Sequence, residues 1–528
     1  MHGFAFWLAH FENSKPIREE IPMYPKKPSM LFLAIVNPGF TRFETTKYGL
    51  KRSYDLLLHK HSILNLAAFL RENGCDAHYA WTECPDERGI VEFKCVIDKL
   101  KPDAIGMSLC TNEFMIHYRF LERLKRTFRR LPVIVGGPHV SALPFHTLTN
   151  FPAIDCIATG DGEHTLAQWL RVKASKDRHY KMREIGGLGY REESGEIFLT
   201  AQRKRITDIN ILPEPAYDLI IKDGATLDSK TVFPIFCSYG CRFHCTFCAA
   251  DHGNYRFFTP DRVAERIEKV YNSYHVKHFS IMDGLWPPSR AWLNEFCDEI
   301  ERRKIRAGFE FATRAESLRE QDFHRLKRIG AETVVVGIES GDEGILRRIK
   351  KGITKETALK AFQAIHDAGI FSAANFMVGN AGETVETIER TIEFASELNP
   401  SIALFRAHCP IPGTEAFEYV DESERDYWMT GSGEKDWWMQ SEIPSVCDLP
   451  FKELQKIAEG TYLNYPLRLE YLRRHVITGW LPYEYKKICF GMFLKHLRKL
   501  AIGTMERFRV LRGIIRRTRR VLKAIFIH

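Results

Sequence analysis

The chain has 528 residues, of which 45% are hydrophobic, and carries a formal net charge of +9. This length predicts about two to four domains, and the absence of any run of about 18 or more apolar residues predicts no membrane-spanning helix. We expect no signal peptide, because the first residues lack a basic leader and a small-residue cleavage site, and the thirteen cysteines, which show no dense disulfide pattern, indicate a reducing cytoplasm.

Residues 1–29 are expected to form an N-terminal extension, and from residue 30 to about residue 175 short apolar runs alternate with helical stretches. This alternation predicts an α/β domain with a parallel, doubly wound sheet. Ligands bind to such sheets beyond the carboxyl ends of the strands. The strands are expected at 31–36, 77–81, 104–108, 133–135 and 156–158, with helices at 63–71 and 115–129 among others.

Glycines directly follow two of these strands. One strand leads into a Gly-Gly-Pro-His run at 136–139, and another leads into Gly-Asp-Gly-Glu at 160–163. A glycine after a strand allows the backbone to approach a ligand closely. Each loop alone is a weak signal, because loops of α/β folds are often rich in glycine.

Residues 176–229 predict a linker between two domains. Charged residues and a Gly-Gly pair at 186–187 interrupt any periodicity, and prolines at 213 and 215 favour an extended path. Strand and helix then alternate again over 230–420. The strands of this second series are expected at 232–237, 277–283, 307–312, 332–338, 370–378 and 401–408, with helices at 262–272 and 355–368 among others.

Three cysteines follow the first strand of this second series. Cys241, Cys245 and Cys248 have three and then two residues between them. A [4Fe–4S] cluster has four irons and normally takes four thiolates, so three thiolates leave one iron with an open site, which is typical of catalytic metals. Zinc is the weaker alternative, because it usually binds two separated pairs of ligands and His244 fits no common zinc spacing. Cys237 is expected to end a buried strand.

Polar residues and glycines stand at the ends of the later strands. Asp283 ends the second strand and is expected to face the carboxyl mouth, where the chemistry of such barrels takes place. Arg314 follows the third strand, and Glu339 and Ser340 end the fourth. The alternative is that these polar residues cap the helices that follow them.

The cysteine spacing is the signature of the radical S-adenosylmethionine (SAM) enzymes, and the chain resembles that superfamily. The six strand–helix repeats match its partial (β/α)6 barrel. In those enzymes the open iron binds the amino and carboxylate groups of SAM, and one electron cleaves SAM to a deoxyadenosyl radical. Ala381 replaces a proline of the family pattern, so its loop is expected to be less rigid. The residues that the resemblance assigns to SAM are Arg314, Glu339, Ser340 and Gly379, the last near the adenine.

The two glycine loops, in this order and upstream of the cysteines, resemble the cobalamin-binding domain of cobalamin-dependent radical SAM enzymes. The usual phrases of that family are G-G-x-H and G-E-G-E, and Asp161 is a mild departure from the second. The alternative is a degenerate Rossmann-like domain kept for packing or partner contacts. The residues that the resemblance assigns to cobalamin are Ser108, Gly136, Gly137, His139, Gly160, Gly162 and Glu163.

The sequence gives no sign of a histidine on the lower face of the cobalt. Many cobalamin proteins supply this ligand from a D-x-H-x-x-G loop. Asp76 and His78 begin that pattern, but Trp81 stands in place of the glycine. We expect His78 to be an ordinary strand residue, and the resemblance therefore implies cobalamin without a histidine ligand.

The C-terminal part is expected to be a helical domain over 421–500 followed by a basic tail over 501–528. Residues 462–469 resemble a segment common in the branch that contains the magnesium-porphyrin cyclases and the hopanoid methylases. The tail holds eight Lys or Arg residues and one acidic residue beside an apolar helical stripe. A basic amphipathic helix indicates a membrane surface or an acidic partner. The alternative is a terminal helix packed on the body with a solvated basic face.

We therefore expect a cytoplasmic, cobalamin-dependent radical SAM enzyme whose tail is a candidate for peripheral contact with the inner face of the membrane. The leading reaction is methylation of an unactivated carbon of a hydrophobic or secondary metabolite. The alternatives are a non-methylating oxidation or cyclisation of the porphyrin-cyclase type and a non-catalytic iron–sulfur sensor or binding protein. The expected partners are an external one-electron reductant of the flavodoxin or ferredoxin type and a small-molecule substrate, with lipids among the candidates, but no nucleic acid.

Overall fold

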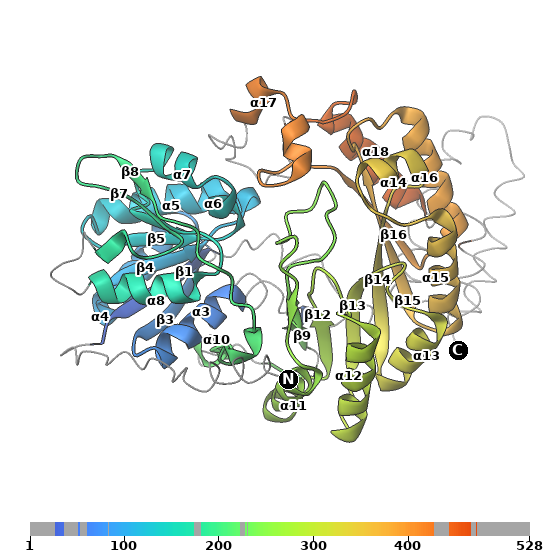
Figure 1. The fold of residues 1–528 in the computed structure, drawn as a ribbon, viewed down its shortest axis with the longest axis horizontal. Coiled ribbons are helices and arrows are strands. Elements are labelled where there is room, and N and C mark those ends of the chain that lie inside the picture. Colours follow the sequence, from blue (N-terminus) through green and yellow to red (C-terminus); the bar gives the residue numbers. More distant parts are fainter. Residues whose placement is uncertain are drawn as a thin grey trace, which may run out of the picture.

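The computed structural model shows two bodies, each built on a sheet, that lie side by side (Figure 1). The expected extension over 1–29 lies almost wholly outside the described residues, and the tail over 501–528 lies wholly outside them. Within the described part of the chain, no helix is long and apolar enough to cross a membrane. The structure describes residues 27–35, 51–52, 61–82, 84–173, 181–221, 227–229, 231–426, 443–465 and 471.

The first sheet is built from the short apolar runs that the sequence predicts. β1 (Ser29–Ile35) is buried at all seven positions, as expected of a strand that is covered on both faces. The sheet has seven strands in the order β3-β1-β4-β5-β6-β7-β8, and β3, β1, β4, β5 and β6 run parallel. The other strands are β3 (Asp76–Thr82), β4 (Ala104–Ser108), β5 (Val133–Gly136), β6 (Cys156–Ala158), β7 (Leu188–Arg191) and β8 (Ile197–Leu199).

Helices cover both faces of this sheet, and each face has its own core. Phe93 and Phe120 belong to the core on one face, and Leu64 and Trp169 belong to the core on the other. The second of these cores continues into the neighbouring body, where Phe233 belongs to it. The main helices are α4 (Glu87–Leu100) and α5 (Phe114–Thr127) on the first face, and α3 (His61–Glu72) and α8 (Gly162–Lys173) on the second.

The expected linker over 176–229 supplies part of this sheet, which corrects the boundary drawn from the sequence. β7 pairs antiparallel with β6, and β8 pairs antiparallel with β7. Gly195, with a φ of +88°, allows the tight turn between the last two strands, where Gly195 N donates to Glu192 O over 2.9 Å. Short strands on both sides of a Ser-Gly pair are a hairpin signal, and the charged residues around it obscured that signal.

The second sheet is curved, and its strands are parallel (Figure 1). It also has seven strands, in the order β16-β15-β14-β13-β12-β9-β2. Each of the expected strands of the second series is present, shifted by a few residues. They are β9 (Thr231–Ile235), β12 (His278–Ile281), β13 (Gly308–Arg314), β14 (Ala331–Glu339), β15 (Phe371–Val378) and β16 (Ile402–Ala407).

The seventh strand of this sheet, β2 (Lys51–Arg52), comes from the part of the sequence that the first domain was expected to occupy. It pairs parallel with β9, with Lys51 opposite Thr231. Two residues are too short for a strand pattern to appear in a sequence, so this crossing between the domains could not be expected.

Helices follow the strands of the second sheet and line its outer side (Figure 1). Beyond residue 421 the described helices are α17 (Glu422–Asp426) and α18 (Phe451–Asn464), and the rest of the expected helical domain over 421–500 lies largely outside the described residues. The helices of the second body are α11 (Pro260–Tyr274), α12 (Arg290–Arg302), α13 (Glu320–Ile329), α14 (Glu343–Arg348), α15 (Lys355–Asp367) and α16 (Val385–Leu398).

Candidate functional site

The three cysteines lie in the loop of a short hairpin that follows β9. The hairpin is closed by β10 (Ser238–Tyr239) and β11 (Arg256–Phe257), which pair antiparallel with Tyr239 opposite Arg256. The loop is held to itself by its backbone, since Cys241 N donates to Asp251 O over 3.2 Å and Gly253 N donates to Cys241 O over 3.1 Å. The three cysteines therefore lie on one loop beyond the carboxyl end of β9.

The thiols are unpaired and largely shielded from solvent. Cys241 and Cys245 are buried, Cys248 is half-buried, and all three are free. Burial raises the pKa of the Cys248 thiol. The buried guanidinium of Arg314 lies 3.5 Å from the sulfur of Cys245 and 3.7 Å from the ring centre of Phe243. Free thiols on one loop beside a buried cation fit a negatively charged group that binds through thiolates, as an iron–sulfur cluster does.

Cys237 lies apart from this loop, and its pKa is raised well above the usual value by burial. The backbone N–H of Cys237 and the hydroxyl of Ser238 both donate to Asp283, over 2.8 and 2.7 Å. Burial raises the pKa of Asp283 to about 7. The carboxyl of Asp283 therefore lies just beyond the carboxyl end of β9, where it is buried against the base of the cysteine hairpin.

The residues assigned to SAM stand at the carboxyl ends of three adjacent strands, β13, β14 and β15. Glu339 ends β14 with a φ of +70°, and its carboxylate lies 2.9 Å from Nζ of Lys351. The Lys351 side chain is buried, at 6% exposure, and the Glu339 side chain is partly buried, at 13%. Such a left-handed conformation is uncommon for residues other than glycine and often marks a functional site.

The contacts of Ser340 favour a structural role at the start of a helix over a direct contact with SAM. Its side chain is fully buried. The hydroxyl lies 3.1 Å from the Thr391 hydroxyl and accepts from Asp342 N over 3.1 Å. The side chain of Asp342 in turn caps α14 by accepting from Ile345 N over 2.9 Å. The Ser340 hydroxyl is thus engaged in holding the start of this helix.

Gly379 stands in a tight turn after β15 with a φ of +97°. Its N–H donates to Glu383 over 2.5 Å, and its carbonyl faces Nδ1 of His408 over 3.3 Å. A Cβ at this position would come within 2.4 Å of Leu454. Burial raises the pKa of Glu383 to about 7. Lys351, Glu383 and His408 were missed from the sequence, because nothing local distinguishes them from ordinary polar residues.

The residues assigned to cobalamin line a cavity of about 430 Å³ at the carboxyl ends of β4, β5 and β6. Glycine is required in its wall, because Gly137 has a φ of +103° and a Cβ there would lie 2.6 Å from the carbonyl oxygen of Leu109. A wall of bare backbone fits a broad planar group such as a corrin. The assigned residues that line the cavity are Ser108, Gly136, Gly137, Gly160, Gly162 and Glu163.

His139 is the exception among the residues assigned to cobalamin. It does not line the cavity, and its ring stacks on Phe114 with centroids 4.0 Å apart. Its Nδ1 lies 3.2 Å from the hydroxyl of Thr111, and burial lowers its pKa to about 4. His139 thus packs in the core beside the loop after β5, and its role in cobalamin binding stays a prediction.

Part of the cavity wall comes from the cysteine hairpin and the residues before it. Phe236 and Tyr239 both line the cavity. The hydroxyl of Tyr239 accepts from Nδ2 of Asn65 over 2.5 Å, and the ring of His61 stacks on Phe236 with centroids 4.1 Å apart. His61 also lines the cavity and was missed from the sequence. The cavity therefore lies between the two bodies, beside the cysteine loop.

Comparisons with protein families match both halves of the chain. Residues 49–170 match the B12 binding domain, and residues 235–395 match the radical SAM superfamily. The chain is 27% identical over 387 residues to an uncharacterized methyltransferase of Pyrococcus horikoshii, covering 72% of this chain and 82% of that protein.

Other relatives carry more specific names. The chain is 27% identical to the anaerobic magnesium-protoporphyrin IX monomethyl ester cyclase of Rubrivivax gelatinosus, over 62% of this chain but only 60% of the cyclase. It is 25% identical to the hopanoid C-3 methylase of Methylococcus capsulatus, over 64% of each chain.

Two solved structures share the fold. The cobalamin-dependent SAM radical enzyme OxsB aligns with a TM-score of 0.66 at 17% identity and covers 94% of this chain and 76% of that one. The radical SAM methyltransferase TsrM of Kitasatospora setae aligns with a TM-score of 0.60 at 17% identity, over 76% of this chain and 75% of that one.

Proposed function

We propose that this chain, which is a cobalamin-dependent radical SAM enzyme with a [4Fe–4S] cluster, SAM and cobalamin as its cofactors, methylates an unactivated carbon of a small hydrophobic metabolite. One observation carries the proposal. Tyr239 lines the glycine-walled cavity and closes the hairpin that bears Cys241, Cys245 and Cys248. A methyl donor in the cavity and a radical source on the hairpin would thus lie on two sides of one short strand pair.

Each cofactor has its own set of residues in this proposal. The three hairpin cysteines hold the cluster, with Arg314 beside them, and the glycine wall holds cobalamin. Glu339 and the backbone around Gly379 hold SAM at the carboxyl ends of β14 and β15. The cofactors supply the radical and the methyl group, and the protein supplies their alignment and keeps water from the site.

The names of two relatives support methylation over the alternatives. The Pyrococcus horikoshii protein and the hopanoid methylase are both named for methyl transfer. The cyclase relative favours a second candidate, a non-methylating oxidation or cyclisation.

In either case we propose an external one-electron reductant of the flavodoxin or ferredoxin type. The basic tail would place the enzyme at a membrane surface, which gives lipids a weak preference as substrates.

Cysteine substitutions test the radical assignment without knowledge of the substrate. Anaerobically reconstituted and reduced protein should release deoxyadenosine from SAM, and Cys241→Ala, Cys245→Ala and Cys248→Ala should each abolish this release. Cys237→Ala is the control, because this thiol is also buried but lies outside the loop, and the variant should retain the cluster. A triple-alanine protein that still binds a full cluster and cleaves SAM would refute the ligand assignment, and reduced wild-type protein that releases no deoxyadenosine would favour the sensor.

The reaction type is tested with SAM that carries a labelled methyl group. Protein incubated with a metabolite extract of its own source should place the label in an extractable product, and supplying cobalamin should increase the yield. A consumed substrate whose product carries no label would instead favour oxidation or cyclisation.

A further inference from the structure

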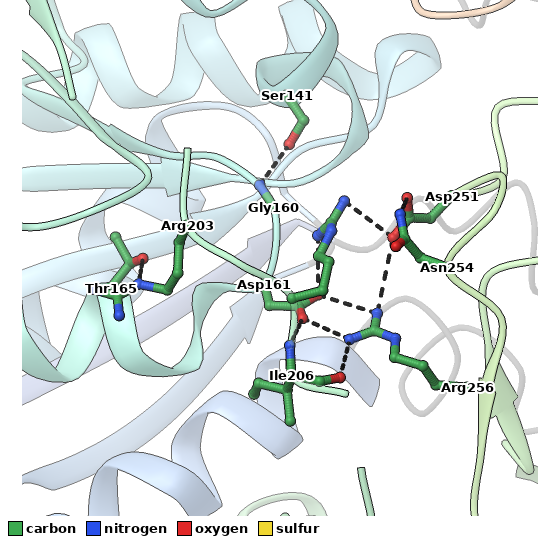
Figure 2. Close-up of polar contacts among 10 residues, drawn as sticks. Ser141, Gly160, Asp161, Thr165, Arg203, Ile206, Asp251, Asn254 and Arg256 are labelled. Carbon is green, nitrogen blue, oxygen red and sulfur yellow. Dashed lines mark hydrogen bonds and ion pairs between the residues drawn. The ribbon is translucent and has the colours of Figure 1, made fainter. Parts of the chain in front are cut away.

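Asp161, the residue by which the second glycine loop departs from the family pattern, joins an ion-pair network between the two bodies (Figure 2). It lines the cavity with its glycine neighbours. Its carboxylate accepts from Arg256 over 2.6 and 3.3 Å, from Arg205 over 2.9 Å, and from Ile206 N over 2.9 Å. Burial alone would raise the pKa of Asp161, but the hydrogen bond from Arg256 and the other contacts hold it below the usual value.

Arg256 connects this carboxylate to the cysteine loop. It stands in β11, directly opposite Tyr239 in β10, so it belongs to the strand pair that closes the hairpin. Its guanidinium lies 6.0 Å from the centre of the Tyr239 ring, and Tyr239 itself lines the cavity. Asp161 therefore binds the base of the hairpin at the point where the hairpin meets the cavity.

A second connection runs through Arg205 and Asp251. Arg205 bridges the two carboxylates, at 2.9 Å from Asp161 and 3.1 Å from Asp251, and Asp251 lies 3.8 Å from Arg256. The backbone carbonyl of Asp251 accepts from Cys241 N over 3.2 Å. The network thus reaches the first cysteine through one residue of its own loop.

The charges of the network alternate and balance, with two carboxylates and two guanidinium groups in contact. Their side chains are 10 to 28% exposed. At such depth, removing one charge leaves its partners desolvated and uncompensated. Loss of the Asp161 charge would leave Arg205 and Arg256 with a single carboxylate between them.

We propose that Asp161 is a positioning residue that fixes the cysteine hairpin against the cavity loop, and thereby sets the separation of the two metal cofactors. This inference rests on the proposed function. The hydrogen bonds of the carboxylate go to Arg205, Arg256 and the N–H of Ile206. It acts through Arg256 on the hairpin base and through Arg205 and Asp251 on the backbone of Cys241.

Hydrogen exchange of the protein without cofactors tests whether Asp161 fixes the cysteine hairpin. In Asp161→Asn, the amides of Cys241 and Gly253 should lose protection, because the hairpin base loses its charged anchor. Asp161→Glu, which restores the charge, should keep the protection. Asp155→Asn is the matched control, because Asp155 also accepts from a lysine and a backbone N–H, at 2.7 Å each, but within the first body only. Unchanged protection of the hairpin in Asp161→Asn would overturn the proposal.

Magnetic coupling between the cluster and the cobalt tests whether Asp161 sets their separation in the protein that holds both cofactors. The reduced cluster should broaden the electron paramagnetic resonance (EPR) signal of cob(II)alamin and speed its relaxation, both in the wild type and in Asp161→Glu. This coupling should weaken in Asp161→Asn at unchanged iron and corrinoid content. Methyl transfer per deoxyadenosine should then fall by about 10²-fold, since a shift of about 1 Å can cost this much. Wild-type coupling in Asp161→Asn, or loss of corrinoid with a fully protected hairpin, would overturn the proposal.

The two readouts separate this proposal from the proposed function. If the wild-type protein takes up neither corrinoid nor cluster, the proposed function fails, and with it the role of Asp161 in separating cofactors. The exchange comparison would still decide whether Asp161 fixes the hairpin.

Discussion

The guanidinium of Arg314 lies 3.5 Å from the sulfur of Cys245, although 69 positions separate the two residues in the chain. Arg314 ends β13, and Cys245 lies in the hairpin loop after β9. The same guanidinium contacts the backbone carbonyl of Lys351 and the carboxylate of Glu316. A buried cation is therefore held beside one of the three thiols by its contacts with Glu316 and Lys351.

Arg314→Met should lower the reduction potential of the cluster, because hydrogen bonds to the sulfurs and nearby positive charge both favour the reduced form. The expected change is about 60 mV or more, since a charged hydrogen bond contributes about 1.5 kcal/mol and a one-electron couple shifts by about 59 mV for a tenfold change. Arg325→Met, which removes an ion pair to Asp298, is the control. Spectroscopic redox titration of both variants checks this, and an unchanged potential in Arg314→Met would contradict it.

Gly137→Ala should abolish corrinoid binding and leave the cluster intact. The new Cβ would collide with backbone atoms of Leu109 at 2.6 and 2.8 Å. The backbone conformation of Gly137, with a φ of 103° and a ψ of 178°, also costs an alanine about 1–3 kcal/mol. Gly195→Ala also places an alanine at a positive φ, +88°, but no atom lies within 4 Å of the new Cβ, so it controls for a positive φ without a collision. Corrinoid and iron content are measured for each, and wild-type corrinoid content in Gly137→Ala would place cobalamin elsewhere.

Cobalamin in this protein should show no histidine nitrogen coupled to cobalt. His61 is a candidate ligand in the cavity wall, and burial, with the positive charge of Arg266, lowers its pKa to about 3, so its imidazole is neutral. However, Nε2 is buried and the ring is held flat against Phe236. We expect the same cob(II)alamin EPR spectrum in the wild type and in His61→Phe. A nitrogen splitting that disappears in His61→Phe would show that His61 binds the cobalt.

Glu383 should make the stability of the second body depend on pH. Burial raises its pKa from 4.5 to about 7 in the folded protein, so the folded form binds more protons than the unfolded form between these values. The free energy of unfolding should therefore fall as the pH rises through this range. Glu383→Gln should reduce this fall and leave the part that is due to Asp283, whose pKa burial also raises to about 7. Glu389→Gln, exposed on α16, should retain the whole fall. Thermal unfolding of the protein without cofactors at about pH 5 and about pH 8 measures the difference, and equal pH dependence in wild type and Glu383→Gln would contradict it.

The tail over 501–528 should direct the protein to anionic membranes. Each basic residue near such a surface contributes about 1 kcal/mol, and the apolar stripe adds burial. Sedimentation with anionic liposomes should show salt-sensitive binding that is lost when residues 503–528 are removed. Neutral liposomes are the control. Equal binding by both forms would remove the membrane role, and with it the preference for a lipid substrate.

The sequence predicted what depends on local pattern. The alternation of apolar strands and helices located both sheets, and the spacing of Cys241, Cys245 and Cys248 located the loop at the end of β9. The glycines of the cavity wall were found because close approach of a backbone requires that residue type. Each of these signals is confined to a few consecutive residues.

What the sequence could not predict depends on contacts between distant segments. His139 stands in a motif typical of cobalamin binding, but its ring stacks on Phe114 of another helix. His61 reaches the cavity wall only because Phe236 of the second body packs on it. The role of Asp161 depends on Arg205 and Arg256, which come from two other parts of the chain. No local sequence pattern indicates any of these contacts between distant segments.

The pairing of β2 with β9 has a consequence for how the protein is made. Residues 51–52 leave the ribosome before any other strand of the second sheet, and β9 emerges only after the whole first sheet has been synthesised. Domains tend to fold in order during synthesis, but here an early segment must wait for a late partner. The same pairing means that a fragment beginning at the second domain, or one lacking residues 1–175, loses an edge strand of its own sheet. Separate expression of the two halves would leave β9 with an open edge, which is a common cause of aggregation.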